Sequence, residues 1–134
     1  MSNTMPSKAL RVLVVEDEAL LSMLVEDALT DLGCVVIGPF MRLQVALEAA
    51  RAGSDIDLAI LDVNVAGERS FPLAELLLEQ GVPVVFTTGY DDAGLEERWR
   101  VLPVLRKPFS DDDLKRTVLR VADARRGVDR NPES

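Results

Sequence analysis

The chain has 134 residues, which suits one domain with one core, and its composition is 48% hydrophobic but only 4% aromatic. Its formal charge of −8 argues against direct nucleic-acid binding, and the lack of histidine excludes histidine metal sites and phosphohistidine chemistry within the chain. The sequence shows neither a signal peptide nor a segment long enough to cross a bilayer, so we expect a cytoplasmic protein that does not bind membranes.

Five short apolar runs alternate with stretches of helical spacing. The runs are RVLVV (11–15), CVVIG (34–38), IDLAIL (56–61), VPVVFT (82–87) and PVLR (103–106). Most are continuous and rich in β-branched residues, which is typical of parallel strands covered on both faces. Helices are expected over 18–32, 42–52, 70–80, 91–100 and 111–125. The pattern predicts an α/β domain over 9–126, a doubly wound five-stranded parallel sheet with five helices, and disordered tails at 1–8 and 127–134.

Ligands of such folds bind at the carboxyl ends of the strands, so the residues directly after each run are the candidates for a site. Glu16 and Asp17 follow the first run and Asp62 follows the third, which brings three carboxylates to one edge of the sheet. Carboxylates that close repel one another, and a hard divalent cation such as Mg²⁺ relieves the repulsion. Thr88 and Lys107 follow the fourth and fifth runs, whereas IGPF after the second run reads as a turn.

An acid cluster, a cation, a lysine and a hydroxyl together indicate phosphoryl-transfer chemistry. The carboxylate of Asp62 is the candidate nucleophile, and Lys107 supplies positive charge to the transferred group. An acid directly after a strand, considered alone, is more often a helix cap than a metal ligand. Lys107 alone is an ion-pair partner of Asp62 that relieves the acid cluster, an interpretation that is compatible with the reactive one in the unphosphorylated state.

These segments resemble the receiver domain of bacterial two-component response regulators. The motifs are VLVVEDE for the acidic pair, LAILDVNVAGE for the phosphoacceptor segment, VVFTTGY for the threonine and LRKPF for the lysine followed by proline. The resemblance implies a flavodoxin-like receiver fold with Asp62 as phosphoacceptor. It implies that Asp17 binds Mg²⁺ or Mn²⁺ directly, that Glu16 acts mainly through water, and that Asn64 offers its backbone carbonyl. Lys107 and Thr88 are then the residues that bond the phosphoryl group.

Three positions depart from the family's pattern. Val104 stands where the family has Tyr or Phe on the fifth strand, so no ring there can follow Thr88 inward on phosphorylation. Ala66 replaces a proline four residues after the phosphoacceptor. The motif FTTGY (86–90) resembles that of short stand-alone receivers associated with HWE-type kinases. We hypothesise that Tyr90 takes over the switch role of the missing ring; the alternative is a half-buried loop aromatic with its hydroxyl in water.

The resemblance implies a signalling protein rather than an enzyme, which receives phosphate from a sensor histidine kinase or a phosphotransfer protein. Because only GVDRNPES follows the last expected helix, we expect a stand-alone regulator that acts through a partner protein. The expected contact surface is the fourth helix, fifth strand and fifth helix. Trp99 is either an exposed anchor there or a core residue, and the surface is compatible with a homodimer.

Several alternatives stay open at this point. The chain is compatible with a phosphate sink or phosphorelay intermediate that drains a kinase, and with a receiver-like binding module that is never phosphorylated. A third alternative is an aspartyl-phosphate phosphatase of another α/β family. Asn64 argues against it, because such phosphatases carry an acid-base aspartate two residues after the nucleophile.

Overall fold

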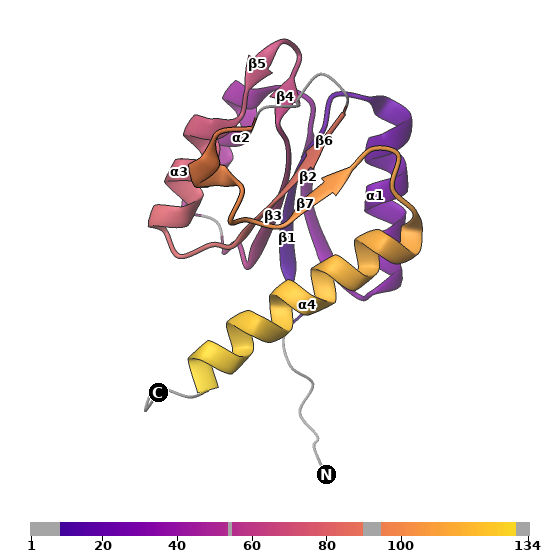
Figure 1. The fold of residues 1–134 in the computed structure, drawn as a ribbon, viewed down its shortest axis with the longest axis vertical. Helices are drawn as coiled ribbons and strands as arrows, with labels where there is room; N and C mark the ends of the chain where they lie inside the picture. Colours follow the sequence, from indigo (N-terminus) through magenta and orange to yellow (C-terminus); the bar gives the residue numbers. More distant parts are fainter. Residues whose placement is uncertain (1–8, 54, 90–94, 131–134) are drawn as a thin grey trace.

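One parallel sheet organises the chain, and its five strands pair in the order β2-β1-β3-β6-β7 (Figure 1). The computed structural model describes residues 9–53, 55–89 and 95–130. The strands are β1 (Arg11–Val15), β2 (Val35–Phe40), β3 (Leu58–Asp62), β6 (Val84–Thr88) and β7 (Val104–Arg106). This confirms the predicted doubly wound parallel sheet. The strand order reverses between β1 and β3, and ligands of such folds bind at the carboxyl side of that point.

Helices cover both faces of the sheet in two pairs (Figure 1). One face carries α1 (Ala19–Asp31) and α4 (Asp111–Arg130), and the other carries α2 (Leu43–Arg51) and α3 (Phe71–Glu79). Side chains of β1 alternate between the faces: Leu13 lies in the core cluster under α2 and α3, whereas Val12 and Val14 lie in the cluster under α1 and α4. Burial on both faces explains why the first apolar run is continuous rather than alternating.

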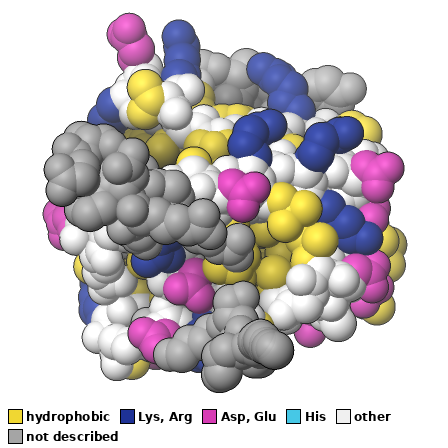
Figure 2. Space-filling view, turned by 90° about the horizontal axis from the view of Figure 1, so that it is seen from below, with side chains coloured by type: hydrophobic (Ala, Val, Ile, Leu, Met, Phe, Trp, Pro, Cys, Tyr) yellow, Lys and Arg dark blue, Asp and Glu magenta, His cyan; other side chains and the backbone are white. Residues whose placement is uncertain are grey.

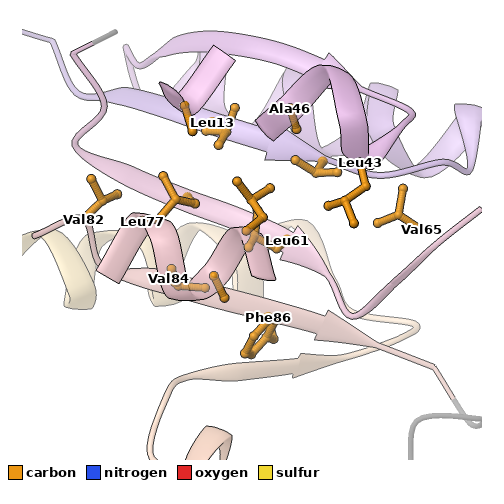
Figure 3. Close-up of a cluster of buried hydrophobic side chains, with 14 of the residues drawn as sticks. Leu13, Leu43, Ala46, Leu61, Val65, Leu77, Val82, Val84 and Phe86 are labelled. Atoms are coloured by element: carbon orange, nitrogen blue, oxygen red, sulfur yellow. The ribbon is translucent and has the colours of Figure 1, made fainter. Parts of the chain in front are cut away.

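The core under α2 and α3 reaches the carboxyl edge of the sheet, where it becomes aromatic. Figure 3 shows Phe86 of β6 in this cluster, among aliphatic side chains from the strands and helices. The ring of Phe86 packs edge-on against those of Phe71 and Trp99, with 5.8 Å and 5.6 Å between ring centroids. The rings of Phe71 and Trp99 stack with their centroids 5.1 Å apart. Trp99 is only 3% exposed and is therefore a core residue, which decides between the two interpretations of its role. Full burial of a large apolar side chain contributes about 1.5–3 kcal/mol.

The predicted helix over 91–100 is wrong for the part that the structure describes. Residues 95–96 are irregular and a short 3-10 helix, η2, spans Glu97–Trp99, while 91–94 lie outside the described residues. The N–H groups of Trp99, Arg100 and Leu102 each donate to a carbonyl three residues earlier. Insertion of the Trp99 ring beside Phe71 fixes this segment against α3 and competes with a regular helix. The described part of the chain therefore has four α-helices.

The second strand continues through Gly38, so the turn predicted for 37–40 is wrong. Gly38 has a φ of +104°, and a Cβ there would lie 2.7 Å from the backbone nitrogen of Phe40 and 3.0 Å from the carbonyl oxygen of Val14. Glycine alone suits this backbone conformation and this space. The pairing with β1 shifts at this point, and the Phe40 carbonyl accepts the N–H of Glu16 at 2.9 Å. The irregular end of β2 therefore helps to hold the first residue of the acidic run.

A short hairpin that was not among the predicted elements follows β3. Its strands, β4 (Asn64–Val65) and β5 (Glu68–Arg69), pair in antiparallel orientation across a two-residue turn. Both turn residues have positive φ, 49° at Ala66 and 85° at Gly67, as the tight turns of such hairpins require. Glycine adopts this conformation freely, whereas alanine is strained in it.

The last helix reaches Arg130, beyond the predicted domain boundary at 126. The helix continues past Gly127, since one glycine inside a helix costs only about 1 kcal/mol and does not by itself end it. The domain boundary and the disordered tails stay predictions. The remaining predicted tails, 1–8 and 131–134, lie outside the described residues. Among the described helices, none combines the length and the apolar character that crossing a bilayer requires.

A hollow of about 590 Å³ lies at the amino edge of the sheet, opposite the acidic run. Figure 2 looks onto this edge and shows hydrophobic side chains lying among charged ones. The hollow is lined by Leu78, Gly81, Val82, Pro83, Pro103, Val121, Ala124 and Arg125. Because it lies at the far end of the strands, it is separate from the candidate site.

Candidate functional site

Lys107, which directly follows β7, contacts three carboxylates at the carboxyl edge of the sheet. Its Nζ lies 2.9 Å from Oδ2 of Asp62, 3.0 Å from Oε1 of Glu18 and 3.2 Å from Oε1 of Glu16. The Lys107 side chain is 17% exposed, and those of Glu16 and Asp62 are each 4% exposed. The ammonium group therefore balances part of a largely buried acid cluster, as the ion-pair interpretation of Lys107 predicts.

The three predicted metal-binding acids lie together. Glu16, Asp17 and Asp62 each offer a carboxylate oxygen, and these oxygens lie within 4.8 Å of one another. Backbone N–H groups orient two of them: Ala66 donates to Oδ2 of Asp17 at 2.8 Å, and Glu18 donates to Oε2 of Glu16 at 3.0 Å. Carboxylate oxygens are the ligands that hard cations such as Mg²⁺ and Mn²⁺ prefer. The donor set therefore fits the cation that the sequence predicts.

Burial governs the protonation of this cluster. Burial raises the pKa of Glu16 to about 7, and the negative charge of Asp62 adds to this rise. The hydrogen bond from the Glu18 N–H and the nearby Lys107 both act to lower the Glu16 pKa. Burial also raises the pKa of Asp62, against the hydrogen bond and charge of Lys107. At Lys107 burial lowers the pKa, but hydrogen bonds to Asp62 and Glu18 and the nearby negative charges outweigh it and raise the pKa overall. Negative charge in the cluster is therefore costly, and a divalent cation offsets that cost.

Ser70 supports the backbone of Asp62. Its hydroxyl donates to the Asp62 carbonyl at 2.6 Å, and its N–H donates to the Val63 carbonyl at 2.9 Å. Ser70 is fully buried and directly precedes α3, where serine is an ordinary helix-cap signal. The sequence showed that signal, but the contact with Asp62 depends on the β4–β5 hairpin, which turns the chain back. Asn64, in the same hairpin, donates its N–H to Oδ1 of Asp62 at 3.4 Å, and its carbonyl as a cation ligand stays a prediction.

Two threonines end β6 beside β3, the strand that ends at Asp62. Thr88 is 5% exposed, its hydroxyl donates to the Gly89 carbonyl at 3.2 Å, and its own carbonyl accepts the Lys107 N–H at 2.8 Å. Thr87 is the register partner of Asp62, and its buried hydroxyl has no hydrogen-bond partner among the described residues. The backbone thus couples β6 to Lys107, and a phosphoryl-binding role for Thr88 stays a prediction.

The predicted switch residues are only partly within the described chain. Tyr90 lies outside the described residues, so its proposed movement stays a prediction. Val104 lies in β7, is 37% exposed, and is the register partner of Phe86 in β6. A valine at this half-exposed position offers no ring for a switch.

Comparison with known proteins points to one family. The family profile of the response regulator receiver domain matches residues 12–119. The transcriptional regulatory protein PdtaR of Mycobacterium tuberculosis (strain CDC 1551 / Oshkosh) is 34% identical over 108 residues, covering 78% of this chain and 52% of PdtaR. The chain thus spans about half the length of this curated relative.

Solved structures agree with this match. The solution structure of SdrG from Sphingomonas melonis Fr1 has a TM-score of 0.76 and 40% identity, and the match covers 85% of this chain and 97% of that one. The BeF3-activated conformation of SdrG from Pseudomonas melonis Fr1 has a TM-score of 0.72 and 38% identity, covering 87% of this chain and 99% of that one. The profile match, the sequence identity and the shared fold show that the chain belongs to the response regulator receiver domain family.

Proposed function

We propose that this receiver domain accepts a phosphoryl group on Asp62 and signals through changed contacts with other proteins. The observation that carries the proposal is the placement of Lys107 Nζ 2.9 Å from Oδ2 of Asp62, inside a cluster of oxygen donors that fits a divalent cation. The relative SdrG has a BeF3-activated conformation. Because BeF3 mimics a phosphoryl group, that conformation supports the same chemistry for this chain.

The reaction needs little beyond positioning and charge. A carboxylate oxygen of Asp62 attacks phosphorus, and the bond from phosphorus to the donor breaks, with the electron pair leaving on the donor. Lys107 opposes the rise that burial causes in the Asp62 pKa, and the ionised carboxylate needs no general base. Lys107 then donates hydrogen bonds to the transferred oxygens. Asp17, with the Asn64 carbonyl and Asp62, would hold Mg²⁺ or Mn²⁺, and Glu16 would act through water. When bound, the cation would supply positive charge to the phosphoryl oxygens.

The phosphodonor we propose is a sensor histidine kinase, of the HWE type, or a phosphotransfer protein. The output surface comprises η2, β7, α4 and the turn between η2 and β7. The exposed side chains of Val101 in that turn, Val104 in β7 and Leu119 in α4 support it as a protein contact. Trp99 lies beneath this surface rather than on it. The same surface suits a homodimer. A cytoplasmic location and a stand-alone mode of action stay predictions.

The test is phosphate incorporation. The purified protein is incubated with Mg²⁺ and acetyl phosphate, and added phosphate is measured by intact mass. The parent should be labelled, Asp62→Asn should not, and the exposed-acid control Asp55→Asn should be labelled like the parent. A parent that takes no label from acetyl phosphate or any other donor, or label that persists in Asp62→Asn, would overturn the proposal.

Label uptake, phosphate release and partner affinity, measured separately, distinguish the alternatives. A receiver-like binding module takes no label, and a phosphatase releases phosphate continuously from a supplied phosphomonoester. A phosphate sink takes label from a kinase but gains no affinity for another protein when labelled. Asn64 continues to argue against the phosphatase, since it provides no second carboxylate two residues after Asp62.

A further inference from the structure

Glu18 gives Lys107 a third carboxylate partner, beyond the two that the proposed reaction uses. A lysine ammonium has three N–H donors. Here the acceptors are Oδ2 of Asp62 at 2.9 Å, Oε1 of Glu18 at 3.0 Å and Oε2 of Glu16 at 3.5 Å. A phosphoryl oxygen can bond Lys107 only if one of these carboxylates leaves. In the unphosphorylated domain, the lysine that should bind the phosphoryl group is therefore fully engaged.

Among the three carboxylates, Glu18 leaves at the lowest cost. Its side chain is 64% exposed, against 4% for Glu16 and 4% for Asp62. A released Glu18 carboxylate returns to water, and exposed ion pairs are weak. A Glu16 carboxylate released from Lys107 would stay buried without the positive charge of that ammonium group, which is far more costly. Glu16 is also held in place by the Glu18 N–H at 3.0 Å.

Building on the proposed function, we propose that Glu18 is a positioning residue for Lys107. In the unphosphorylated domain Glu18 occupies the N–H group of Lys107 that would otherwise bond the phosphoryl group. Glu18 thereby selects against small free phosphodonors. The class it selects against is small dianionic acyl phosphates, which must displace a negatively charged side chain from Lys107 before transfer. A kinase docked on the domain holds its phosphoryl group at high effective concentration, so the same competition slows it less.

The chemistry of transfer itself is unchanged by Glu18. The bond that forms joins a carboxylate oxygen of Asp62 to phosphorus, and the bond that breaks joins phosphorus to the acetate oxygen of acetyl phosphate. The electron pair leaves with acetate. Glu18 exchanges only its hydrogen bond to Lys107 for water.

The experiment compares initial rates of labelling by acetyl phosphate at saturating Mg²⁺ for the parent, Glu18→Gln, Glu18→Asp and the remote exposed-acid control Glu48→Gln. Glu18→Gln should be labelled about 2- to 5-fold faster, as expected for the loss of one exposed ion pair. Glu18→Asp keeps the charge but is too short for the contact with Lys107, so it should show most of the gain. Raising the salt from about 50 mM to about 500 mM should shrink the difference, because salt weakens exposed ion pairs.

Three results would overturn the inference: Glu18→Gln at or below the parent's rate, a gain no larger than that of Glu48→Gln, or Glu18→Asp at the parent's rate. The last result would show that the negative charge at position 18, rather than its contact with Lys107, sets the rate of labelling. A parent that takes no label overturns the proposed function and this inference together. A labelled parent with an unchanged Glu18→Gln overturns this inference alone.

Discussion

Replacing Glu16 by Gln removes one buried negative charge and keeps an oxygen that can accept the Glu18 N–H. Burial raises the pKa of Glu16 from 4.5 to about 7, so the folded protein holds this proton more tightly than the unfolded chain. The proton's contribution to stability is therefore fully present below pH 4.5 and is lost as the pH rises through about 7. Above that pH, the folded parent carries a charge that its surroundings disfavour.

The size of the effect follows from the same shift. One pKa unit corresponds to about 1.4 kcal/mol, so a rise from 4.5 to about 7 corresponds to about 3 kcal/mol. In the absence of divalent cations, Glu16→Gln should raise the free energy of unfolding by about 3 kcal/mol near pH 8 and by about 1 kcal/mol near pH 5. The gain arises because glutamine has no charge to bury.

Urea denaturation in EDTA, followed by circular dichroism near pH 5 and near pH 8, measures both values, with Glu48→Gln as an exposed control. Saturating Mg²⁺ should shrink or reverse the gain near pH 8, because the cation stabilises the parent by binding to its carboxylates. An equal gain at both pH values would refute the reasoning, since only a titrating carboxylate makes the gain depend on pH. A loss of stability near pH 8 would refute it as well.

Two further predictions concern the core and the hairpin. Trp99→Ala should lower the free energy of unfolding by about 3–5 kcal/mol, because Trp99 is 3% exposed and stacks on Phe71 with ring centroids 5.1 Å apart. Urea denaturation measures this change. A loss below about 1 kcal/mol would mean that the ring is not packed as described. Ala66→Gly should raise the same free energy by about 1 kcal/mol, because it relieves a φ of 49°. The matched change Ala49→Gly, inside α2, should lower it by about 1 kcal/mol, and equal effects at the two sites would contradict the strain at Ala66.

The sheet and the acid cluster could be predicted because both follow from local patterns. Continuous apolar runs indicate strands buried on two faces, and parallel strands bring their carboxyl ends to one edge. Glu16, Asp17 and Asp62 therefore had to lie near one another once the runs were recognised, and the structure places their oxygens within 4.8 Å. Lys107 follows from the same argument, since it comes directly after the last strand.

The features that could not be predicted depend on contacts across the sheet. Gly38 looked like part of a turn, but pairing with β1 carries the strand through it. The hairpin turn contains Ala66, whose positive φ no propensity would suggest. Trp99 was placed in a helix, yet its ring is held in the core by Phe71, and tertiary packing of this kind overrides local helical spacing. The hydrogen bond from Ser70 to the Asp62 carbonyl depends on the β4–β5 hairpin, which was not predicted.

The burial of Trp99 has a spectroscopic consequence. It is the single tryptophan of the chain, so all indole emission comes from one place. Its ring touches Phe86, two residues before Thr88 on the same strand, and Arg98 lies 4.5 Å from the ring centre. Emission should therefore lie toward short wavelengths and respond to any displacement of the end of β6. The domain therefore carries its own fluorophore in contact with β6, the strand that pairs with Asp62, and movement of β6 can be timed without attaching a dye.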